Sequence, residues 1–273
     1  MIKRIINKII LLFKKKELNP YHDYPFGRKP IAPKDKYIEI WKNAKSKSYY
    51  EMDNYETELD YSIDKEWLDE LALHTQVVIK KSDICYQHGR ILFSTLCHYI
   101  KTNIHSSINI VEVGTARGFS ALCMAKALKF MEVKGNIITI DPLPHDIKMY
   151  WNCIDDLNGE KTRKELLIAY NNLIEEYIKF IEGTSKKILN KIKFHRIHFA
   201  FIDGTHEYDN IIYEFKQIMN NQHSGDIIVF DDYTSGLFPG VVKAVDEICN
   251  TYKYSKNVIQ ATNDRGYVIA AKE

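Results

Sequence analysis

The sequence of 273 residues lacks several features that would assign it directly to a class of protein. Its 5 cysteines are scattered and form no Cys-x-x-Cys pair, which argues against a disulfide framework or a zinc site and favours reduced thiols in a cytoplasmic protein. The formal net charge is only +2, so no overall field points to nucleic acid. Repeats and low-complexity tracts are also missing. What is present, 45% hydrophobic residues, is ample for one substantial domain with an appendage.

A long apolar run is missing too, although residues 1–16 are unusual. They place isoleucine and phenylalanine on one helical face and lysine and arginine on the other. The apolar part is broken by Lys8 and would span only roughly 18 Å as a helix, too short for a bilayer. No small-residue cleavage site follows, which disfavours a signal peptide. We expect a basic amphipathic helix that lies on the inner face of the cytoplasmic membrane or packs against the protein itself or a partner copy.

One stretch, Ile108–Ser120, organises the rest of the chain. A short apolar strand ends at Gly114, and Gly118 opens an amphipathic helix. The glycines let the backbone approach a ligand, and the start of the helix offers free N–H groups. The spacing Glu-x-Gly-x-x-x-Gly-x-Ser differs from the Gly-x-Gly-x-x-Gly of dinucleotide folds, and Glu112 disfavours a pyrophosphate but suits a cationic ligand. The alternative is a glycine turn needed only for packing.

A second apolar strand, residues 136–141, ends in an acid. Asp141 follows Gly118 near the spacing of about 20 residues at which an acid binds ribose hydroxyls in nucleotide-binding folds. With Glu112 and the two glycines, Asp141 resembles the S-adenosylmethionine (SAM) site of the class I methyltransferases. That resemblance implies that the glycine turn holds the amino-acid end of SAM, that Asp141 holds the ribose, and that the turn after the third strand flanks the adenine. The implied cofactor site consists of Glu112, Gly114, Thr115, Gly118, Phe119, Ser120, Asp141, Gly183, Thr184, Ser185 and Asp203.

Two later strands also deliver acids. Asp203 and then His206 follow the apolar strand at 197–202, while Asp231 and Asp232 follow the strand at 225–230. Carboxylates at the carboxyl ends of neighbouring strands repel one another without a counter-charge, which a hard divalent cation such as Mg²⁺ supplies. The alternatives are acids that cap helices or bind SAM, and a histidine that hydrogen-bonds locally.

The pattern Asp-Gly-x-His with a later Asp-Asp resembles the metal-dependent macrocin/mycinamicin type of sugar O-methyltransferase. More broadly, about residues 85–273 resemble the bacterial SAM methyltransferases found with surface-polysaccharide genes. The resemblance implies that Asp203, Asp231 and Asp232 hold Mg²⁺ and that His206 acts as the catalytic base. It also implies a sugar hydroxyl as acceptor, on a glycan, a glycolipid or a nucleotide-linked sugar. The first residue of the later acidic pair is Asp, where some relatives have Glu.

The C-terminal segments predict an antiparallel hairpin. Residues 257–262 and 265–271 read as strands joined by Asn263-Asp264. After five strand–helix units, this hairpin resembles the class I methyltransferase sheet, whose last strand is antiparallel. We therefore predict a doubly wound, Rossmann-like α/β fold with three parts: a basic helix at 1–16, an N-terminal arm and helical extension at 17–82, and the SAM-dependent methyltransferase domain at 83–273.

Several segments outside these motifs also carry expectations. Residues 17–62 are expected to form an extended arm that wraps the protein or closes over substrate, and a homodimer that exchanges this arm is plausible. Helices are expected at 64–80, 83–101 and 161–176. We expect Gln87, His88 or Arg90, in the polar break before the first strand, to line the cofactor pocket. In the long loop after the second strand, His145, Tyr150 and Trp151 are candidate contacts for the substrate.

Three other functions compete with sugar methylation. A SAM methyltransferase acting on a small phenolic or natural-product hydroxyl would share every motif, because a metal also binds a catechol-like diol. An NAD-linked oxidoreductase is disfavoured by the glycine spacing, by Glu112 and by the C-terminal hairpin. A membrane-surface scaffold without activity is disfavoured by the intact acids and His206.

Overall fold

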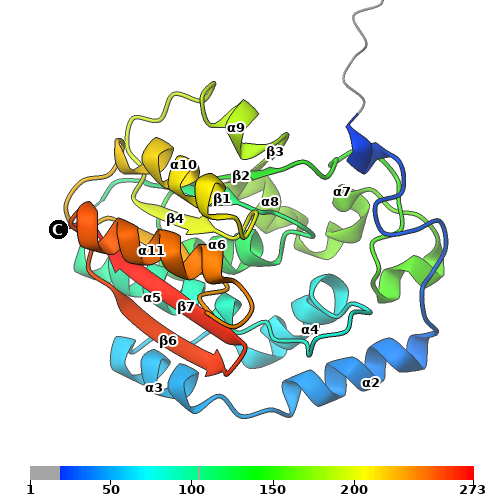
Figure 1. The fold of residues 1–273 in the computed structure, drawn as a ribbon. Coiled ribbons are helices and arrows are strands. Elements are labelled where there is room, and N and C mark those ends of the chain that lie inside the picture. The colour runs from blue at the N-terminus through cyan, green and yellow to red at the C-terminus, as the bar shows by residue number, and fades with distance from the viewer. Residues whose placement is uncertain (1–18, 104) are drawn as a thin grey trace, which may run out of the picture.

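The computed structural model describes residues 19–103 and 105–273, and these residues are organised around one seven-stranded sheet (Figure 1). The strand order is β3-β2-β1-β4-β5-β7-β6. The strands are β1 (Ile108–Val113), β2 (Gly135–Asp141), β3 (Ile178–Glu182), β4 (Phe199–Ile202), β5 (Ile227–Phe230), β6 (Asn257–Thr262) and β7 (Arg265–Ala271).

The pairing of the strands confirms the predicted fold class. Strands β1 to β5 are mutually parallel, whereas β7 runs antiparallel to both β5 and β6. The order reverses at β1, from which β2 and β3 lie on one side and β4 and β5 on the other. In open sheets of this kind, ligands bind outside the carboxyl ends of the strands at such a reversal. The glycine turn directly after β1 lies at this point.

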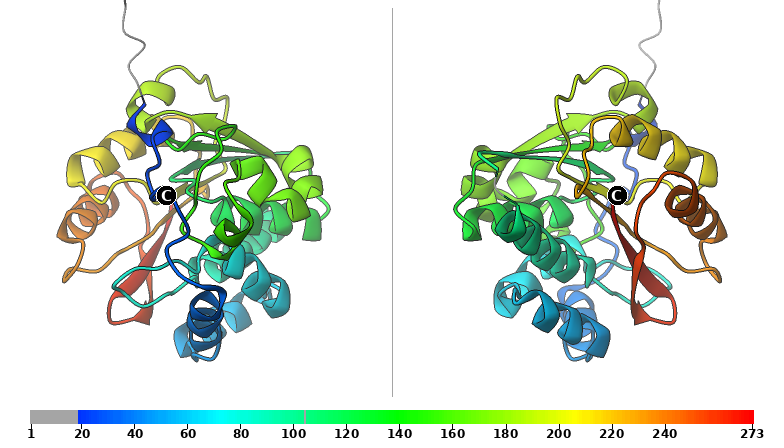
Figure 2. Two further views of the ribbon diagram at one scale, coloured as in Figure 1. Left: turned by 90° about the vertical axis from the view of Figure 1, so that its right-hand side faces the viewer. Right: turned by 90° about the vertical axis from the view of Figure 1, so that its left-hand side faces the viewer.

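Helices cover both faces of the sheet (Figures 1 and 2). The side chains of β4 show why: Phe199 and Phe201 pack with one apolar cluster, and Ala200 and Ile202 with the other. Helices α5 and α6 pack against the first face, and α10 and α11 pack against the second. The α-helices are α2 (Lys34–Lys45), α3 (Tyr50–Leu59), α4 (Lys65–Thr75), α5 (His88–Thr102), α6 (Phe119–Phe130), α7 (Arg163–Leu166), α8 (Asn171–Tyr177), α9 (Ser185–Ile188), α10 (Tyr208–Met219) and α11 (Pro239–Thr251). Short 3-10 helices are η1 (Pro20–His22), η2 (Ile154–Asn158) and η3 (Ile168–Tyr170).

The N-terminal region wraps the domain, but it is not extended as we predicted. Helices α2 and α3 occupy much of residues 17–62, and Figure 1 shows them along the lower edge of the molecule. Tyr55 of α3 is buried, and its hydroxyl lies 2.7 Å from the hydroxyl of Thr95 in α5. The backbone N–H of Gln260 in β6 donates to Glu51 over 2.6 Å. Tertiary contacts thus add to the apolar periodicity of α2, where Tyr37, Ile40, Trp41 and Ala44 recur at helical spacing.

The connection between β2 and β3 also differs from prediction. Instead of one helix at 161–176, it contains the short helices η2, α7, η3 and α8. Trp151, an expected substrate contact, is fully buried, and its indole N–H donates to the carbonyl of Lys161 over 2.7 Å. The ring of His145 stacks on Phe180 at 4.4 Å between centroids. Trp151 therefore belongs to the core of this connection and is closed to substrate.

The amphipathic helix predicted at residues 1–16, with its membrane or partner contact, lies outside the described residues. Among the helices at 19–103 and 105–273, none has the length and apolar character needed to cross a bilayer.

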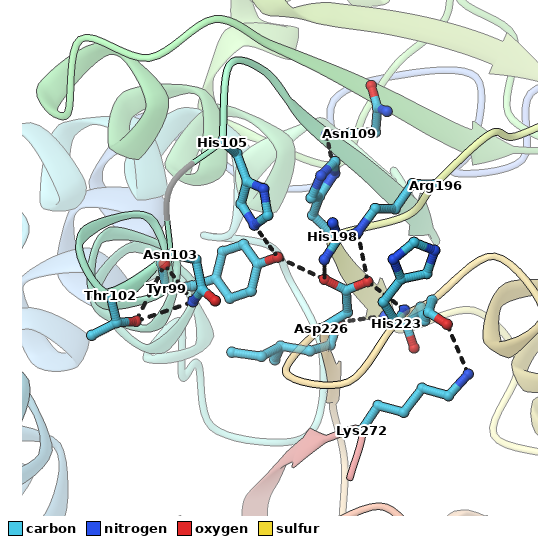
Figure 3. Close-up of polar contacts among 12 residues, drawn as sticks. Tyr99, Thr102, Asn103, His105, Asn109, Arg196, His198, His223, Asp226 and Lys272 are labelled. Carbon is cyan, nitrogen blue, oxygen red and sulfur yellow. Dashed lines mark hydrogen bonds and ion pairs between the residues drawn. The ribbon is translucent and has the colours of Figure 1, made fainter.

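A second polar network lies at the amino end of the sheet, away from the glycine turn (Figure 3). Asp226 precedes β5 and is completely buried. Its carboxylate accepts from Arg196 at 2.8 and 3.1 Å and from the Tyr99 hydroxyl at 2.6 Å. Nearby, Nδ1 of His198 accepts from the backbone N–H of Asn109 over 3.0 Å. Burial first, and then the charge of Arg196, lower the pKa of His198 to about 4. The network anchors the starts of β1, β4 and β5.

Candidate active site

The turn after β1 has a backbone that requires glycine. Gly114 and Gly118 have φ values of +101° and +93°, in the left-handed region. A Cβ atom on Gly114 would collide with the carbonyl oxygen of Asp203, the residue that follows β4. The N–H of Gly118 closes the turn by donating to Thr115 over 2.7 Å. The two glycines therefore bring the turn directly against the end of β4.

Glu112, which the sequence predicted to belong to the cofactor site, lies inside the protein. It is fully buried, and its carboxylate accepts from the hydroxyls of Ser120 and Thr139. Burial raises the pKa of Glu112 to about 7, although both hydrogen bonds oppose this change. The carboxylate links β1, β2 and the first turn of α6. Its position suits a structural brace for the glycine turn.

Two other predicted cofactor side chains are also used internally. Thr115 pairs with the hydroxyl of Thr139, and Phe119 is buried with its ring 4.9 Å from that of His88. Only backbone groups of these two residues remain for a ligand in this region.

Asp141 lies at the glycine turn, as predicted from its place after β2. Its two oxygens accept from the backbone N–H groups of Ala116 at 2.8 Å and Leu143 at 2.7 Å. Because each carboxylate oxygen can accept a second bond, Asp141 retains capacity for a ligand hydroxyl. The parallel register of β2 and β3 places Gly183 next to it, with its N–H 2.9 Å from the Asp141 carbonyl.

The other two residues of the third turn are placed differently. Ser185 donates to Glu214 of α10 over 2.6 Å, so its side chain faces α10. Thr184 is exposed and is the N-cap residue of α9.

Acidic and basic side chains converge beyond the ends of β4 and β5. Nε2 of His206 lies 2.9 Å from Oδ2 of Asp232 and 3.8 Å from Oδ1 of Asp203. The two carboxylates raise the pKa of His206 to about 10, so the imidazole is protonated at neutral pH in this arrangement. Arg265, the first residue of β7, donates to the other oxygen of Asp232. Burial alone would raise the pKa of Asp232, but His206 and Arg265 together hold it below its usual range.

The candidate metal ligands differ in part from the predicted set of three acids. Ligand atoms of Asp203, His206 and Asp232 all lie within 4.8 Å of one another. Asp231 is not part of this group: it is 7% exposed, and its carboxylate accepts from the Asp232 N–H over 2.7 Å. Burial first, and then the neighbouring carboxylates, raise the pKa of Asp231 well above its usual range. The structure thus brings two of the three predicted acids together with His206, which we expected from the sequence to act as a base.

A cavity of about 170 Å³ opens onto this cluster. Of the three residues proposed from the polar break at 87–90, His88 lines it, whereas Arg90 pairs with Asp53 at 2.6 Å and with Glu56. Burial first, and then Arg265, lower the pKa of His88 to about 3. The remaining lining comes from residues that we did not predict, namely Gln76, Lys80, Cys85, Arg265 and Tyr267.

Arg265 is the most informative of the missed residues. It directly follows the Asn263-Asp264 turn, and β7 begins beside the point where β5 ends, because the two strands are antiparallel. A basic residue at the start of an antiparallel last strand is therefore the signal that points to it. Lys80 carries no such signal. Burial and then the charge of Arg265 lower the pKa of Lys80.

Comparisons with known proteins agree with this geometry. Residues 111–233 match the family described as "Methyltransferase domain". The solved structure of the O-methyltransferase NovP is 18% identical, with a TM-score of 0.51 over 67% of this chain and 78% of that one. An O-methyltransferase from Bacillus cereus in complex with SAH is 15% identical, with a TM-score of 0.51 over 80% and 91%. TomG from Streptomyces achromogenes, solved with SAM, is 14% identical, with a TM-score of 0.53 over 78% and 92%.

At these identities, the structural likeness establishes the fold. No match to the sequence was found among curated proteins. The family match covers the stretch from β1 to Tyr233, which includes the glycine turn and the three acids beyond β4 and β5. Residues 111–233 therefore match a methyltransferase domain, and the described chain has the fold of the class I O-methyltransferases.

Proposed function

We propose that this protein transfers the methyl group of SAM to a hydroxyl group of a sugar, on a glycan, a glycolipid or a nucleotide-linked sugar, with the help of a divalent cation. The observation that carries the proposal is the convergence of Asp203, His206 and Asp232 beside the glycine turn. A sugar hydroxyl is a poor nucleophile at neutral pH, so its methylation requires a positioned proton acceptor and a means of stabilising negative charge on oxygen.

For the cofactor, we propose the region between the glycine turn and Asp141. SAM supplies an electrophilic methyl group on a sulfonium. The turn at Gly114 offers close backbone approach, and Asp141 has acceptor capacity left for ribose hydroxyls. Glu112 acts indirectly, by holding the turn and the start of α6 in place.

For the divalent cation, the residues present fit. Asp203 and Asp232 offer carboxylate oxygens, and Mg²⁺ is commonly held by one or two carboxylates together with substrate and water. The cation would lower the pKa of an acceptor hydroxyl and fix its position. We assign His206 the role of proton acceptor, because its Nε2 lies beside Asp232. The two carboxylates hold the pKa of His206 at about 10, so Nε2 becomes available to accept a proton once a cation offsets their charge.

In this proposal, the chain's own residues perform three tasks. Asp203 and Asp232 set the position of the acceptor, and His206 takes the proton from its hydroxyl as the oxygen attacks the methyl carbon. The carbon–sulfur bond breaks as the carbon–oxygen bond forms, so the products are the methyl ether and S-adenosylhomocysteine. Asp231, bonded to the backbone of its neighbour, orients Asp232.

The test is a screen for SAM-dependent release of S-adenosylhomocysteine, with sugar acceptors on one side and catechol on the other. We expect turnover with sugars that is lost in chelator and restored by Mg²⁺. Turnover with catechol alone would replace the proposal by small-molecule phenolic methylation. Turnover that is unaffected by chelator would remove the cation from it.

Two variants separate the roles of His206 and Asp232. His206→Ala is expected to lower kcat by about 10²–10⁴-fold, the usual contribution of general base catalysis, while calorimetric Mn²⁺ binding persists. Asp232→Asn is expected to weaken Mn²⁺ binding itself. If His206→Ala also abolishes Mn²⁺ binding, the histidine is a ligand of the cation and the base assignment is wrong.

A further inference from the structure

A second, larger cavity adjoins the candidate active site. Its volume is about 640 Å³, and it shares Cys85 and Arg265 with the 170 Å³ cavity over the acidic cluster. Its walls come from the segment at 82–85, the loop before α11 and the turn between β6 and β7. A ligand that enters the smaller cavity can therefore extend into the larger one past Cys85 and Arg265.

The lining of this cavity combines an apolar surface with polar groups around it. Tyr49, Ile84, Leu237 and Phe238 supply the apolar part, and Leu237 is 52% exposed. The ring of Phe238 also lies 4.3 Å from that of His206, a residue that lines the smaller cavity. An apolar surface with a polar rim suits a pyranose ring, which has apolar C–H faces and hydroxyls at its edge.

The charges around the cavity are balanced. Lys47 pairs with Asp83 at 2.6 Å, and Arg265, which pairs with Asp232, stands beside Asp264. The other polar groups are neutral hydrogen-bonding side chains from Ser82, Thr262 and Asn263. A neutral, polyhydroxylated ligand matches this lining better than a strongly anionic one.

The two volumes indicate how long the ligand is. An apolar cavity of about 150 Å³ holds one benzene ring, so the 170 Å³ cavity has room for one ring-sized unit. The adjoining 640 Å³ lies within the range of about 300–1,000 Å³ that is typical of sites for larger ligands. A single catechol or monosaccharide would leave the larger cavity unfilled.

We propose that the larger cavity is an acceptor subsite for a neutral oligosaccharide, which binds at least one sugar unit beyond the one that is methylated. This inference rests on the proposed sugar methylation and adds that the substrate is a glycan of two or more units. The methylated ring lies over the acidic cluster, and the next unit lies against Leu237 and Phe238.

Cysteine protection tests the inference with simple glycosides in place of the natural acceptor. Cys85 reports on the junction of the two cavities, and a Leu237→Cys variant reports on the far wall. Both are made in a Cys249→Ser background, because Cys249 is the other described cysteine that is not buried. Ile168→Cys, at an exposed position (63%) in η3, is the matched control.

Alkylation by N-ethylmaleimide is followed by mass spectrometry in the presence of SAM and Mg²⁺. The probes are methyl glycosides of rhamnose, mannose and galactose and the corresponding disaccharide glycosides, with catechol as a one-ring probe. We expect at least one disaccharide, at ten times its Kd, to slow alkylation of both Cys85 and the cysteine at 237 by about tenfold. Monosaccharides and catechol should protect Cys85 alone, and no probe should protect the cysteine at 168.

The outcomes separate this inference from the proposed function. If sugars are methylated but no disaccharide protects position 237, the acceptor subsite is wrong and the proposed function stands. If disaccharides protect both positions but are not methylated, the cavity binds saccharides but is not an acceptor subsite, and the proposed reaction is wrong. Protection of neither reporter by any saccharide overturns the inference.

Discussion

Replacing Arg265 with glutamine tests how the charge of the acidic cluster is balanced. Arg265 donates to Asp232, whose side chain is only 5% exposed, so the substitution removes a positive charge from the immediate surroundings of the candidate ligands. Glutamine keeps a hydrogen-bond donor but not the charge. We expect Arg265→Gln to bind a divalent cation more tightly than the unaltered protein, because the guanidinium and the cation compete for the same carboxylate.

The magnitude follows from the electrostatics. A guanidinium and a divalent ion about 5 Å apart repel by ~7 kcal/mol at an effective dielectric constant of about 20. The Arg265 side chain is 20% exposed and can move toward solvent, so most of this repulsion is relieved in the protein. We expect a net gain of about 1.4 to 3 kcal/mol, which corresponds to a Kd lower by about 10- to 100-fold. The loss of the bond to Asp232 should cost about 2 kcal/mol of folding stability in the cation-free protein.

The assay is calorimetric titration with Mn²⁺ in the absence of acceptor, together with thermal unfolding with and without the ion. The matched control is Lys256→Gln, which removes a cation that pairs with Asp246 at 2.8 Å near the same hairpin. The control should leave the Mn²⁺ affinity unchanged. If Arg265→Gln binds Mn²⁺ no more tightly than the control does, Arg265 does not oppose cation binding, and the electrostatic account of the cluster is refuted.

Three further predictions address the cofactor turn, the polar network and the N-terminus. Gly114→Ala should cost about 3 kcal/mol of stability or more and weaken SAM binding in calorimetry, because φ is +101° and a Cβ meets a backbone carbonyl; Gly236→Ala, where a Cβ meets nothing within 4 Å, should be near neutral. Burial and Arg196 lower the pKa of His198 to about 4, so the stability that neutral His198 contributes is full above about pH 6.5 and is lost as the pH falls toward 4. Between pH 7 and pH 4.5, the free energy of unfolding in urea should therefore fall by about 2 kcal/mol less for His198→Gln than for the parent, and equal falls would contradict this. Deleting residues 1–16 should abolish sedimentation with anionic vesicles while turnover on a soluble acceptor persists; unchanged sedimentation would favour a protein contact for this segment.

Particular residues show how far the sequence carries. The apolar strands, their order along the chain and the terminal hairpin are local patterns, and each one predicted the correct element. Gly114 and Gly118 are needed by local backbone geometry, so the glycine turn was also visible in the sequence. Because parallel strands all end at one edge, the acids after β4 and β5 were predicted to lie together, and Asp203 and Asp232 do.

Only the tertiary structure decided which side chains face the cluster and which face the core. Direction and burial depend on partners far away in the sequence. Hydroxyls from β2 and α6 enclose Glu112, whereas the carboxylate of Asp231 accepts from the backbone N–H of Asp232 and lies outside the group of Asp203, His206 and Asp232. The guanidinium of Arg265 reaches Asp232 because an antiparallel strand begins where β5 ends.

The helices at 34–59 show a different limit. Tyr37, Ile40, Trp41 and Ala44 recur at helical spacing, so α2 was visible in the sequence even though the charged, proline-containing composition suggested an extended arm. The docking of α3 depends on contacts with α5 and β6 that the sequence does not show. Local sequence thus determined the order of the elements and the position of the site along the sheet. Long-range packing determined the charge, the lining and the volume of that site, since those properties arise only where distant segments meet.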